Sequence, residues 1–244
     1  MKPYALILGA TSDIAKHIVL ELAKKSYNLY LIGRNTEELA LVQRSIEKYN
    51  VESKVYVLDI LNLKDSIQIY NDLKPKPELV ISALGYYGNQ DLARENFEEC
   101  YQTAIVNYLG VMLLVNHISI DFEKTGFGKI GVISSVAGIR GRQLNYIYGS
   151  SKAGISTYLS GLRNKLFKKN ISITTILLGP VYTRMSQGHN LIPYITLSPE
   201  TAARKIVGAI ESCKDEVYIH WIWRFIMLAI KLIPETIFKR LPPF

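Results

Sequence analysis

The stretch Tyr4-Ala-Leu-Ile-Leu-Gly-Ala-Thr-Ser-Asp-Ile-Ala15 decides the fold. Its first five residues form a short apolar run that is typical of a fully buried strand. A turn of glycine and small residues follows, and from Asp13 to Lys25 apolar residues recur at helical spacing. A strand that leads through such a turn into an amphipathic helix begins a βαβ unit, so the pattern predicts a parallel sheet.

The same alternation continues along the chain. It predicts strands over 29–32, 54–58, 79–81, 129–134 and 171–178, with an edge strand over 216–219. It predicts helices over 37–49, 63–73, 97–122 and 146–168, and one that begins near Pro199. We therefore expect an α/β chain: a single Rossmann-type doubly wound domain over residues 1–219, with a mostly parallel seven-stranded sheet and helices on both faces. The irregular segment 184–198 is the expected substrate lid, and residues 220–244 form an apolar, basic tail.

Composition narrows the class of protein. Of 244 residues, 48% are hydrophobic and 20% are charged, which is typical of a globular chain. Two cysteines and four scattered histidines predict neither a disulfide framework nor a metal site, and we expect the cytoplasm, with the inner face of the membrane as a further location. No apolar run is expected to span a bilayer. The net charge of +8 suits phosphorylated ligands or anionic surfaces, but no nucleic-acid signature is present, so we expect no nucleic-acid partner.

The first turn and the end of the second strand suggest a nucleotide. Small residues at 9–12 let the backbone approach a pyrophosphate, which the helix N-terminus can hold. The alternative is a plain strand-to-helix turn capped by Ser12 or Asp13. Arg34 follows the second strand, where a guanidinium can bind a 2′-phosphate, so NADP(H) is the preferred cofactor and NAD(H) the second choice. The alternative for Arg34 is a solvated loop arginine.

A tyrosine and a lysine stand four residues apart at the start of the helix expected over 146–168. Tyr148 and Lys152 therefore share one face of that helix. The similar pair Tyr70 and Lys74 has no serine-bearing strand end beside it, and we interpret it as a surface pair. Ile133-Ser-Ser-Val-Ala-Gly138 ends the fifth strand at the carboxyl edge of the sheet, where open α/β sheets bind ligands.

With these motifs in this order, the sequence resembles the classical short-chain dehydrogenase/reductase family from about residue 4 to residue 219. The turn 9–15 resembles its glycine-rich turn, and the segments 82–85, 107–110 and 179–183 stand where its other signatures stand. The resemblance implies that the chain is an NAD(P)-dependent enzyme acting on CH–OH groups. The cofactor contacts that it implies, together with Arg34, are Gly9, Thr11, Ser12, Asp13, Ile14, Asp59, Ile60, Ala83, Leu84, Gly85, Tyr148, Lys152, Gly179, Val181 and Thr183.

The resemblance also implies a catalytic tetrad of Asn107, Ser135, Tyr148 and Lys152. Tyr148 would be the acid in reduction and the base in oxidation, and the ammonium of Lys152 would bring its pKa down from the usual ~10. Ser135 would hydrogen-bond the substrate oxygen. Lys152 would also bind the nicotinamide ribose, and Asn107 would hold a proton-relay water. Taken singly, several of these residues have structural alternatives. Asn107 could be a buried polar group of a helix, Ser135 a strand-end cap and Lys152 a solvated lysine, and Thr183 could be a loop cap.

The sequence departs from the family pattern at several positions. Asp13 and Ala15 replace two glycines of the turn, Ala83 and Leu84 alter the next motif, and Leu178 replaces a proline. The charge of Asp13 should repel phosphate unless the side chain points away or caps the helix. An alternative function is therefore a nucleotide-binding protein without turnover.

The tail opens with Trp221 and Trp223 and carries Arg224 and Lys231 on one helical face. This composition predicts a helix at a membrane interface, giving peripheral contact; the alternative is a cover for the cleft or for a neighbouring subunit. Similar tails occur in decaprenylphosphoryl-2-keto-arabinose reductases. That likeness suggests a small-molecule or lipid-linked carbonyl substrate that is amphipathic or sugar-like, with a fatty ketone as the alternative. In the family, the helices 97–122 and 146–168 pack against partners, which implies a homodimer or homotetramer.

Overall fold

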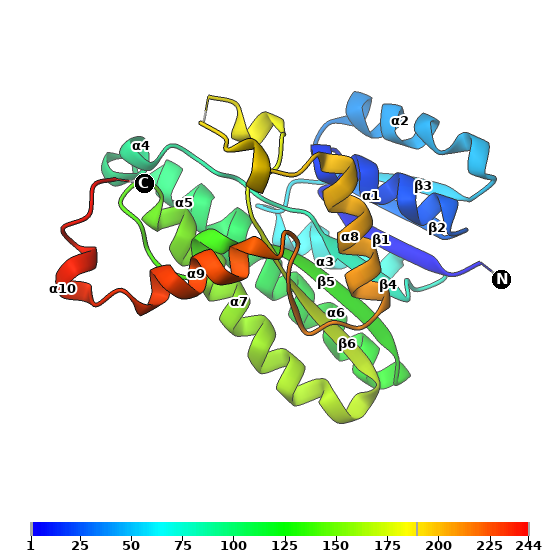
Figure 1. The fold of residues 1–244 in the computed structure, drawn as a ribbon. Coiled ribbons are helices and arrows are strands. Elements are labelled where there is room, and N and C mark those ends of the chain that lie inside the picture. Colours follow the sequence, from blue (N-terminus) through cyan, green and yellow to red (C-terminus); the bar gives the residue numbers. More distant parts are fainter. Residues whose placement is uncertain (1, 189, 244) are drawn as a thin grey trace.

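The computed structural model describes residues 2–188 and 190–243 (Figure 1). Its centre is a seven-stranded sheet of order β3-β2-β1-β4-β5-β6-β7, in which all neighbouring strands are parallel. The strands are β1 (Tyr4–Leu8), β2 (Asn28–Gly33), β3 (Ser53–Val57), β4 (Leu79–Ser82), β5 (Gly128–Ser135), β6 (Ile171–Leu178) and β7 (Glu216–Tyr218). The predicted doubly wound fold is confirmed. Strand order reverses between β1 and β4, and open α/β sheets bind their ligands in the crevice at such a point, outside the carboxyl ends of the strands.

Helices cover both faces of the sheet (Figure 1). One apolar cluster joins one face of the strands to α1 (Asp13–Lys24), α2 (Thr36–Ser45) and α8 (Pro199–Glu211). A second cluster joins the other face to α3 (Leu63–Asp72), α6 (Gly110–Thr125) and α7 (Tyr146–Leu166). Alternate residues of β1 enter different clusters, as Leu6 and Ile7 do. Burial on both sides explains why the strands read as continuous apolar runs.

The longest helical stretch corrects one expectation. Helix α5 (Phe97–Ala104), a π-helical turn at Ile105–Leu109 and α6 form one segment that is long and apolar enough to cross a membrane. Residues 100–120 contain no Asp, Glu, Lys or Arg, so the expectation that no such run exists was wrong. However, 56% of its most apolar window is buried, and Val111, Leu114 and Val115 pack in the core beneath the sheet. The segment is a core helix of the domain.

Two short elements differ from the sequence pattern. Helix α4 (Gln90–Glu95) was not predicted because six residues are too few to show helical periodicity. Its start is fixed by Asn89, whose side chain accepts hydrogen bonds from the amides of Asp91 and Leu92. The helix predicted over 37–49 ends at Ser45 and gives way to a 3-10 turn at Glu47–Tyr49.

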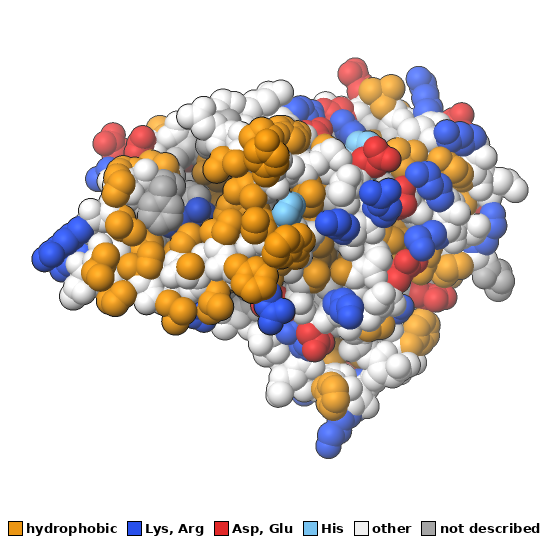
Figure 2. Space-filling model, viewed as in Figure 1, with side chains coloured by type: hydrophobic (Ala, Val, Ile, Leu, Met, Phe, Trp, Pro, Cys, Tyr) orange, Lys and Arg blue, Asp and Glu red, His pale blue; other side chains and the backbone are white. Residues whose placement is uncertain are grey.

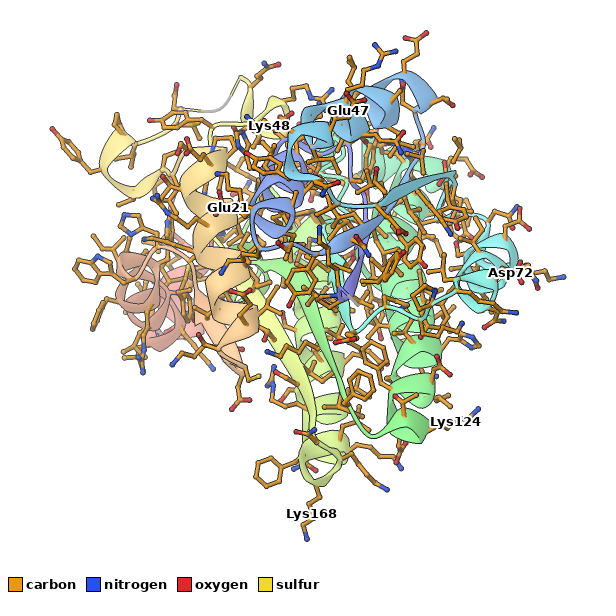
Figure 3. All side chains as sticks on the ribbon, turned by 90° about the vertical axis from the view of Figure 1, so that its right-hand side faces the viewer. Glu21, Glu47, Lys48, Asp72, Lys124 and Lys168 are labelled. Carbon is orange, nitrogen blue, oxygen red and sulfur yellow. The ribbon has the colours of Figure 1, made fainter. Side chains whose placement is uncertain are left out.

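Charged side chains lie at the surface, and Lys152 is the one buried exception among the described residues. Figure 3 shows Glu47, Lys48, Asp72, Lys124 and Lys168 extending outward from the outer helices and helix ends. Lys124 stands in the last turn of α6, and Lys168 lies in the 3-10 turn after α7, where cations complement helix dipoles. The space between helices and sheet is filled mainly by apolar groups.

The lid and the tail lie at the carboxyl end of the sheet. The lid contains 3-10 turns at Arg184–Ser186 and Pro193–Ile195, and its His189 lies outside the described residues. The tail forms α9 (Ile222–Leu232) and α10 (Glu235–Phe238), separated at Pro234. Trp223 and Met227 of α9 pack on Val136 and Leu177.

A single arginine fastens the end of α9. Nη1 of Arg140 donates to the carbonyls of Ile230 (2.6 Å) and Ile233 (2.5 Å), and Nη2 pairs with Glu235 at 2.9 Å. The Phe238 ring stacks against the same guanidinium at 3.7 Å. The tail is therefore docked on the domain by polar as well as apolar contacts.

Candidate active site

Two glycines bring the end of β5 against the start of α7. A Cβ on Gly138 would lie 2.7 Å from the amide nitrogen of Ala153, and one on Gly149 would lie 2.9 Å from the carbonyl oxygen of Ala137. Any side chain at these positions would push the 3-10 turn at Val136–Gly138 away from α7. The close approach places Ser135, the last residue of β5, within hydrogen-bond reach of Tyr148.

Ser134, which the sequence analysis did not single out, fixes α7 relative to β5. Its hydroxyl donates to the carbonyl of Lys152 at 3.0 Å and lies 2.7 Å from the hydroxyl of Ser156. Lys152 is only 3% exposed, and its Nζ donates to the carbonyl of Ile133 at 3.1 Å. Ser134 and Ile133 thus fix the position of the Lys152 ammonium.

Asn107 lies in the π-helical turn between α5 and α6 and is 1% exposed. Its Nδ2 donates to the carbonyls of Tyr86 (2.5 Å) and Thr103 (2.8 Å), while its Oδ1 accepts from the amide of Tyr86 at 3.1 Å. Its amide therefore holds the chain just after Gly85. Such π turns inside helices are frequent at functional sites.

Gly85 marks the point where the candidate catalytic groups converge. A Cβ on Gly85 would lie 3.8 Å from Oδ1 of Asn107 and 3.9 Å from Nζ of Lys152, with Cε of Met185 at 3.5 Å. The structure therefore brings Asn107 and Lys152 to one place. Nζ of Lys152 lies 5.7 Å from the centre of the Tyr148 ring, and Tyr148 in turn hydrogen-bonds Ser135 at the end of β5.

The electrostatics of the pair differ from the expectation. Burial raises the pKa of Tyr148 to about 12, although its hydrogen bond with Ser135 acts in the opposite direction. Burial also lowers the pKa of Lys152 to about 8, because desolvation disfavours the charged ammonium. The expected lowering of the Tyr148 pKa by the ammonium is thus outweighed by desolvation. Near neutrality the phenol is protonated, which suits a proton donor.

The phosphate turn has the backbone geometry that a pyrophosphate needs. Gly9 has φ +77, which favours glycine, and a Cβ there would meet the carbonyl oxygen of Ala83 at 3.0 Å. Ser12 is the N-cap of α1, as one alternative had it, and its hydroxyl accepts from the amide of Ala15 at 3.2 Å. The amides of Asp13 and Ile14 in the first helical turn have no acceptor within the helix. They are available to an anion at the crevice beside β1.

Asp13, the departure that put phosphate binding in doubt, is paired with the lid. Its carboxylate accepts from the backbone amide of Arg184 (2.7 Å) and from Nε of the same residue (3.1 Å). The guanidinium also pairs with Glu38 at 2.9 Å and donates to the carbonyl of Thr11 at 3.0 Å. These interactions lower the pKa of Glu38 and raise that of Arg184. The charge of Asp13 is therefore neutralised by a residue 171 positions away.

Arg34 and Asp59 stand at neighbouring strand ends. Arg34 follows β2, and its Nη1 lies 3.8 Å from the carboxylate of Asp59 after β3. The arginine side chain is 63% exposed, so its remaining donors are open to a ligand. Asn35 caps α2 by accepting from the amide of Glu38. The side chain of Ile60 is buried against Gly110 and belongs to the core.

The other implied cofactor residues lie along the same crevice. Ala83 packs on the α1 side of the sheet and Leu84 on the opposite side. After β6, Gly179 is in contact with the indole of Trp223: a Cβ there would lie 2.3 Å from Nε1. Thr183 donates to the carbonyl of Val181 at 3.3 Å, and Val181 forms a bridge with Leu197. The cradle at Gly85, the free amides after Ser12 and the exposed Arg34 fit an extended dinucleotide.

Sequence reasoning missed several residues around Tyr148. The ring of Tyr87 lies 5.0 Å from that of Tyr148, and Gln90 accepts from the amide of Ile147 at the start of α7. Only contact across the fold identifies them, since no motif contains them. They border a small hollow of about 10 Å³, which has room for about one water molecule and is lined by Tyr87, Asn89, Gln90, Ala93, Thr103, Leu144, Asn145, Ile147 and Tyr148.

A hollow at the amino ends of β5 and β6, beside Lys129 and Arg163, contains none of the predicted site residues. Within residues 2–188 and 190–243, no group of three or more His, Cys, Asp or Glu side chains is placed to hold a metal ion.

Curated relatives match nearly the whole chain. An uncharacterized oxidoreductase of Mycobacterium tuberculosis is 29% identical over 243 residues, covering 97% of this chain and 96% of that protein. A fatty acyl-CoA reductase of Acinetobacter baylyi is 28% identical over 222 residues, covering 88% of this chain and 75% of that protein. The likeness to the mycobacterial protein includes the tail.

Solved structures share the fold. A short chain dehydrogenase from Burkholderia cenocepacia in complex with NADP has a TM-score of 0.84 at 20% identity, covering 99% of this chain and 98% of its own. A short-chain dehydrogenase from Sphingobium yanoikuyae in complex with NADPH has a TM-score of 0.83 at 17% identity, covering 98% and 96%. The short chain dehydrogenase family model matches residues 3–191. The chain therefore belongs to the short-chain dehydrogenase family of NAD(P)-dependent oxidoreductases.

Proposed function

We propose that this protein reduces a carbonyl compound to a secondary alcohol with NADPH, and that Tyr148 donates the proton. The proposal rests on the closeness of four side chains, those of Asn107, Ser135, Tyr148 and Lys152. Asn107 and Lys152 approach Gly85, while Ser135 hydrogen-bonds Tyr148 on the adjoining turn. NADPH, when bound, supplies the hydride. The protein's own residues hold the oxygen and transfer the proton.

Each side chain has a task that follows from its contacts. Ser135 and the phenol of Tyr148 can both hydrogen-bond one substrate oxygen, which stabilises the charge that develops on it. Tyr148 then transfers its phenolic proton to that oxygen. Lys152, held by Ile133, keeps a positive charge beside the place that Gly85 leaves open. Asn107 hydrogen-bonds the backbone of Tyr86 and so fixes the chain next to Gly85.

Protonation supports reduction as the working direction. Because burial raises the pKa of Tyr148 to about 12, nearly all molecules carry the phenolic proton near neutrality. Oxidation would first require removal of that proton. For the cofactor, the exposed guanidinium of Arg34 supports NADP(H), with NAD(H) as the second choice. Related structures contain NADP, NADPH or NAD.

For the substrate, we propose an amphipathic carbonyl compound that is lipid-linked or sugar-like. Curated relatives include a fatty acyl-CoA reductase and a very-long-chain 3-oxoacyl-CoA reductase, so a fatty ketone is the alternative. A ketone panel assayed by loss of NADPH absorbance tests the proposal. Reduction of any member supports it. If NADPH binds but no member is reduced, the alternative of a nucleotide-binding protein without turnover, motivated by Asp13, Ala15 and Ala83, replaces it.

The outer face of the tail supports contact with an anionic membrane surface. Figure 2 shows hydrophobic side chains gathered over α9, α10 and the segment before α8. The exposed ones include Trp221, Phe225, Leu228 and Leu232, which recur at helical spacing opposite the buried Trp223 and Met227. Ile192 and Tyr194 of the lid are 58% and 89% exposed.

Charge favours lipid over a second copy of this face. Arg224, Lys231, Lys239 and Arg240 are exposed around it, and the acid of the segment, Glu235, is paired with Arg140. Two such faces would repel each other, whereas anionic headgroups attract both. We propose that the protein acts in the cytoplasm at the inner face of the membrane. A homodimer or homotetramer, proposed from the family resemblance, would use other surfaces.

Sedimentation with vesicles tests the membrane contact. The double variant Trp221→Ser with Leu228→Ser should lose binding to vesicles that contain phosphatidylglycerol, because it removes the apolar area that enters the interface. Phe167→Ser is the matched control, since Phe167 is 80% exposed at the far end of α7. Equal sedimentation of both variants and the wild type would remove the membrane from the proposal.

A further inference from the structure

Backbone hydrogen bonds close the lid at its base, where it leaves β6 and returns towards α8. The amide of Leu197 donates to the carbonyl of Pro180 at 3.2 Å, and the amide of Tyr182 donates to the carbonyl of Leu197 at 3.0 Å. These two bonds end at Leu197 and do not reach the 3-10 turn at Pro193–Ile195. The turn therefore depends on a further contact to keep its place.

Trp223 of the tail helix α9 makes that contact. Its indole Nε1 donates to the carbonyl of Ile195 at 3.1 Å, and the side chain of Ile195 packs against the same apolar cluster. A Cβ on Gly179 would lie 2.3 Å from Nε1, so a side chain there would displace the indole. Trp223 is 8% exposed, and a buried N–H that loses its acceptor costs free energy. The indole thus touches the chain both where the lid begins and where it returns.

The helix that carries Trp223 is fixed to the segment that follows β5. Met227, one turn further along α9, is fully buried and packs with Trp223 on Val136, the residue after Ser135. At the other end of α9, Arg140 donates to two backbone carbonyls of the tail. Val136 and Arg140 both belong to the segment that begins at Ser135, so the tail connects the lid to the segment that presents this serine.

We propose that Trp223 is a positioning residue for substrate binding: it attaches the lid to the tail and so keeps the lid beside the catalytic side chains. The lid reaches those side chains through Met185, whose Cε would lie 3.5 Å from a Cβ on Gly85, where Asn107 and Lys152 converge. A lid released from Trp223 would spend part of its time away from this place. The inference rests on the proposed function, because it gives Trp223 a task in the reduction.

Limited proteolysis with chymotrypsin tests the attachment without turnover. Tyr194 is 89% exposed, and the bond after it leads to Ile195, whose carbonyl Trp223 holds. Cleavage requires local opening, so its rate reports the open population when opening and closing are fast. Trp223→Phe removes the N–H and keeps an aromatic ring, and it should speed cleavage after Tyr194 by about threefold to tenfold, the usual effect of one hydrogen bond. Cleavage after Phe167, which is 80% exposed at the far end of α7, is the internal control and should change by less than about twofold.

Two further variants separate the hydrogen bond from packing. Met227→Ala removes buried packing from the same helix but no hydrogen bond to the lid, so it should lower Tm and change cleavage after Tyr194 by less than about twofold. Gly179→Ala should displace the indole and speed this cleavage in the wild type, but add little in the Trp223→Phe background. Unchanged cleavage in Trp223→Phe, or an equal increase in Met227→Ala, would overturn the attachment.

Kinetics test the positioning role, with the member of the ketone panel that the wild type reduces fastest. Trp223→Phe should raise KM by about threefold to tenfold, because fewer molecules hold the lid in place before the substrate binds. Both kcat and the Kd for NADPH should change by less than about twofold, since Trp223 touches none of the four catalytic side chains. Faster cleavage with an unchanged KM would overturn the positioning role. If no ketone is reduced while protection by Trp223 persists, the proposed reduction fails and the attachment of the lid to the tail stands.

Discussion

Removing Arg184 should weaken NADPH binding because Asp13 would then stand uncompensated at the phosphate turn. The guanidinium makes hydrogen bonds to Asp13, Glu38 and the carbonyl of Thr11. In Arg184→Ala, Asp13 would lose its counter-charge, whereas Glu38 would keep its ion pair with Lys16 at 3.3 Å. The stability of the fold should change little, since the arginine side chain is 54% exposed and exposed ion pairs contribute about 0–1 kcal/mol.

The size of the effect follows from Coulomb's law. Two unit charges about 8 Å apart repel by about 2 kcal/mol at an effective dielectric constant of about 20. Salt reduces this at an exposed site, so we expect about 1.4 kcal/mol, or about a tenfold rise in the Kd for NADPH. Asp13→Gly in the same chain should recover most of the lost affinity, because it removes the charge that Arg184 compensates.

Fluorescence titration of NADPH against the wild type, both single variants and the double variant measures the coupling between Asp13 and Arg184. Lys25→Ala is the matched control, since Lys25 pairs with Glu211 at 2.9 Å with similar exposure and lies away from the turn. If Arg184→Ala weakens binding as much in the Asp13→Gly background as in the wild type, the two residues are independent. Arg184 would then not act on NADPH binding by compensating the charge of Asp13.

Three further changes have defined outcomes. Arg34→Asp should raise the Kd ratio of NADPH to NADH by at least about tenfold through loss of a phosphate fork; an unchanged ratio would exclude Arg34 from cofactor choice. The rate of reduction should fall as pH rises through about 8, where Lys152 loses its proton. Lys152→Arg should remove this fall in rate, because arginine stays charged. A fall in rate that persists in the variant would belong to another group. Gly149→Val should lower both Tm and activity, because overpacking against Ala137 costs ~1–3 kcal/mol of stability. Gly161→Ala, on the open face of α7, should raise stability by up to ~1 kcal/mol. Equal Tm values for the two variants would show that the contact of Gly149 with Ala137 does not limit stability.

The strands and long helices could be predicted because their signals are local. The apolar runs at Tyr4–Leu8 and Ile171–Leu178 are buried on both faces, and that burial is written directly in their composition. The order of the motifs likewise located Tyr148 and Lys152 on α7 and Ser135 at the end of β5.

Features that depend on distant contacts could not be predicted. Nothing near Asp13 indicates that Arg184 neutralises it, and nothing near Gly179 indicates that Trp223 of the tail packs on it. The Tyr148 pKa was predicted in the wrong direction, because helical spacing reports the lysine charge but not the burial that outweighs it. The π turn at Asn107 has no apolar periodicity of its own.

The central claim is that the phenol of Tyr148 supplies the proton in carbonyl reduction. Its most direct test is the single-turnover rate of NADPH oxidation by Tyr148→Phe, with the ketone that the wild-type protein reduces fastest. We expect a loss of at least about a hundredfold, within the ~10²–10⁴ expected for a missing general acid, with the Kd for NADPH unchanged. A Tyr148→Phe protein that oxidises NADPH at the wild-type rate would contradict it.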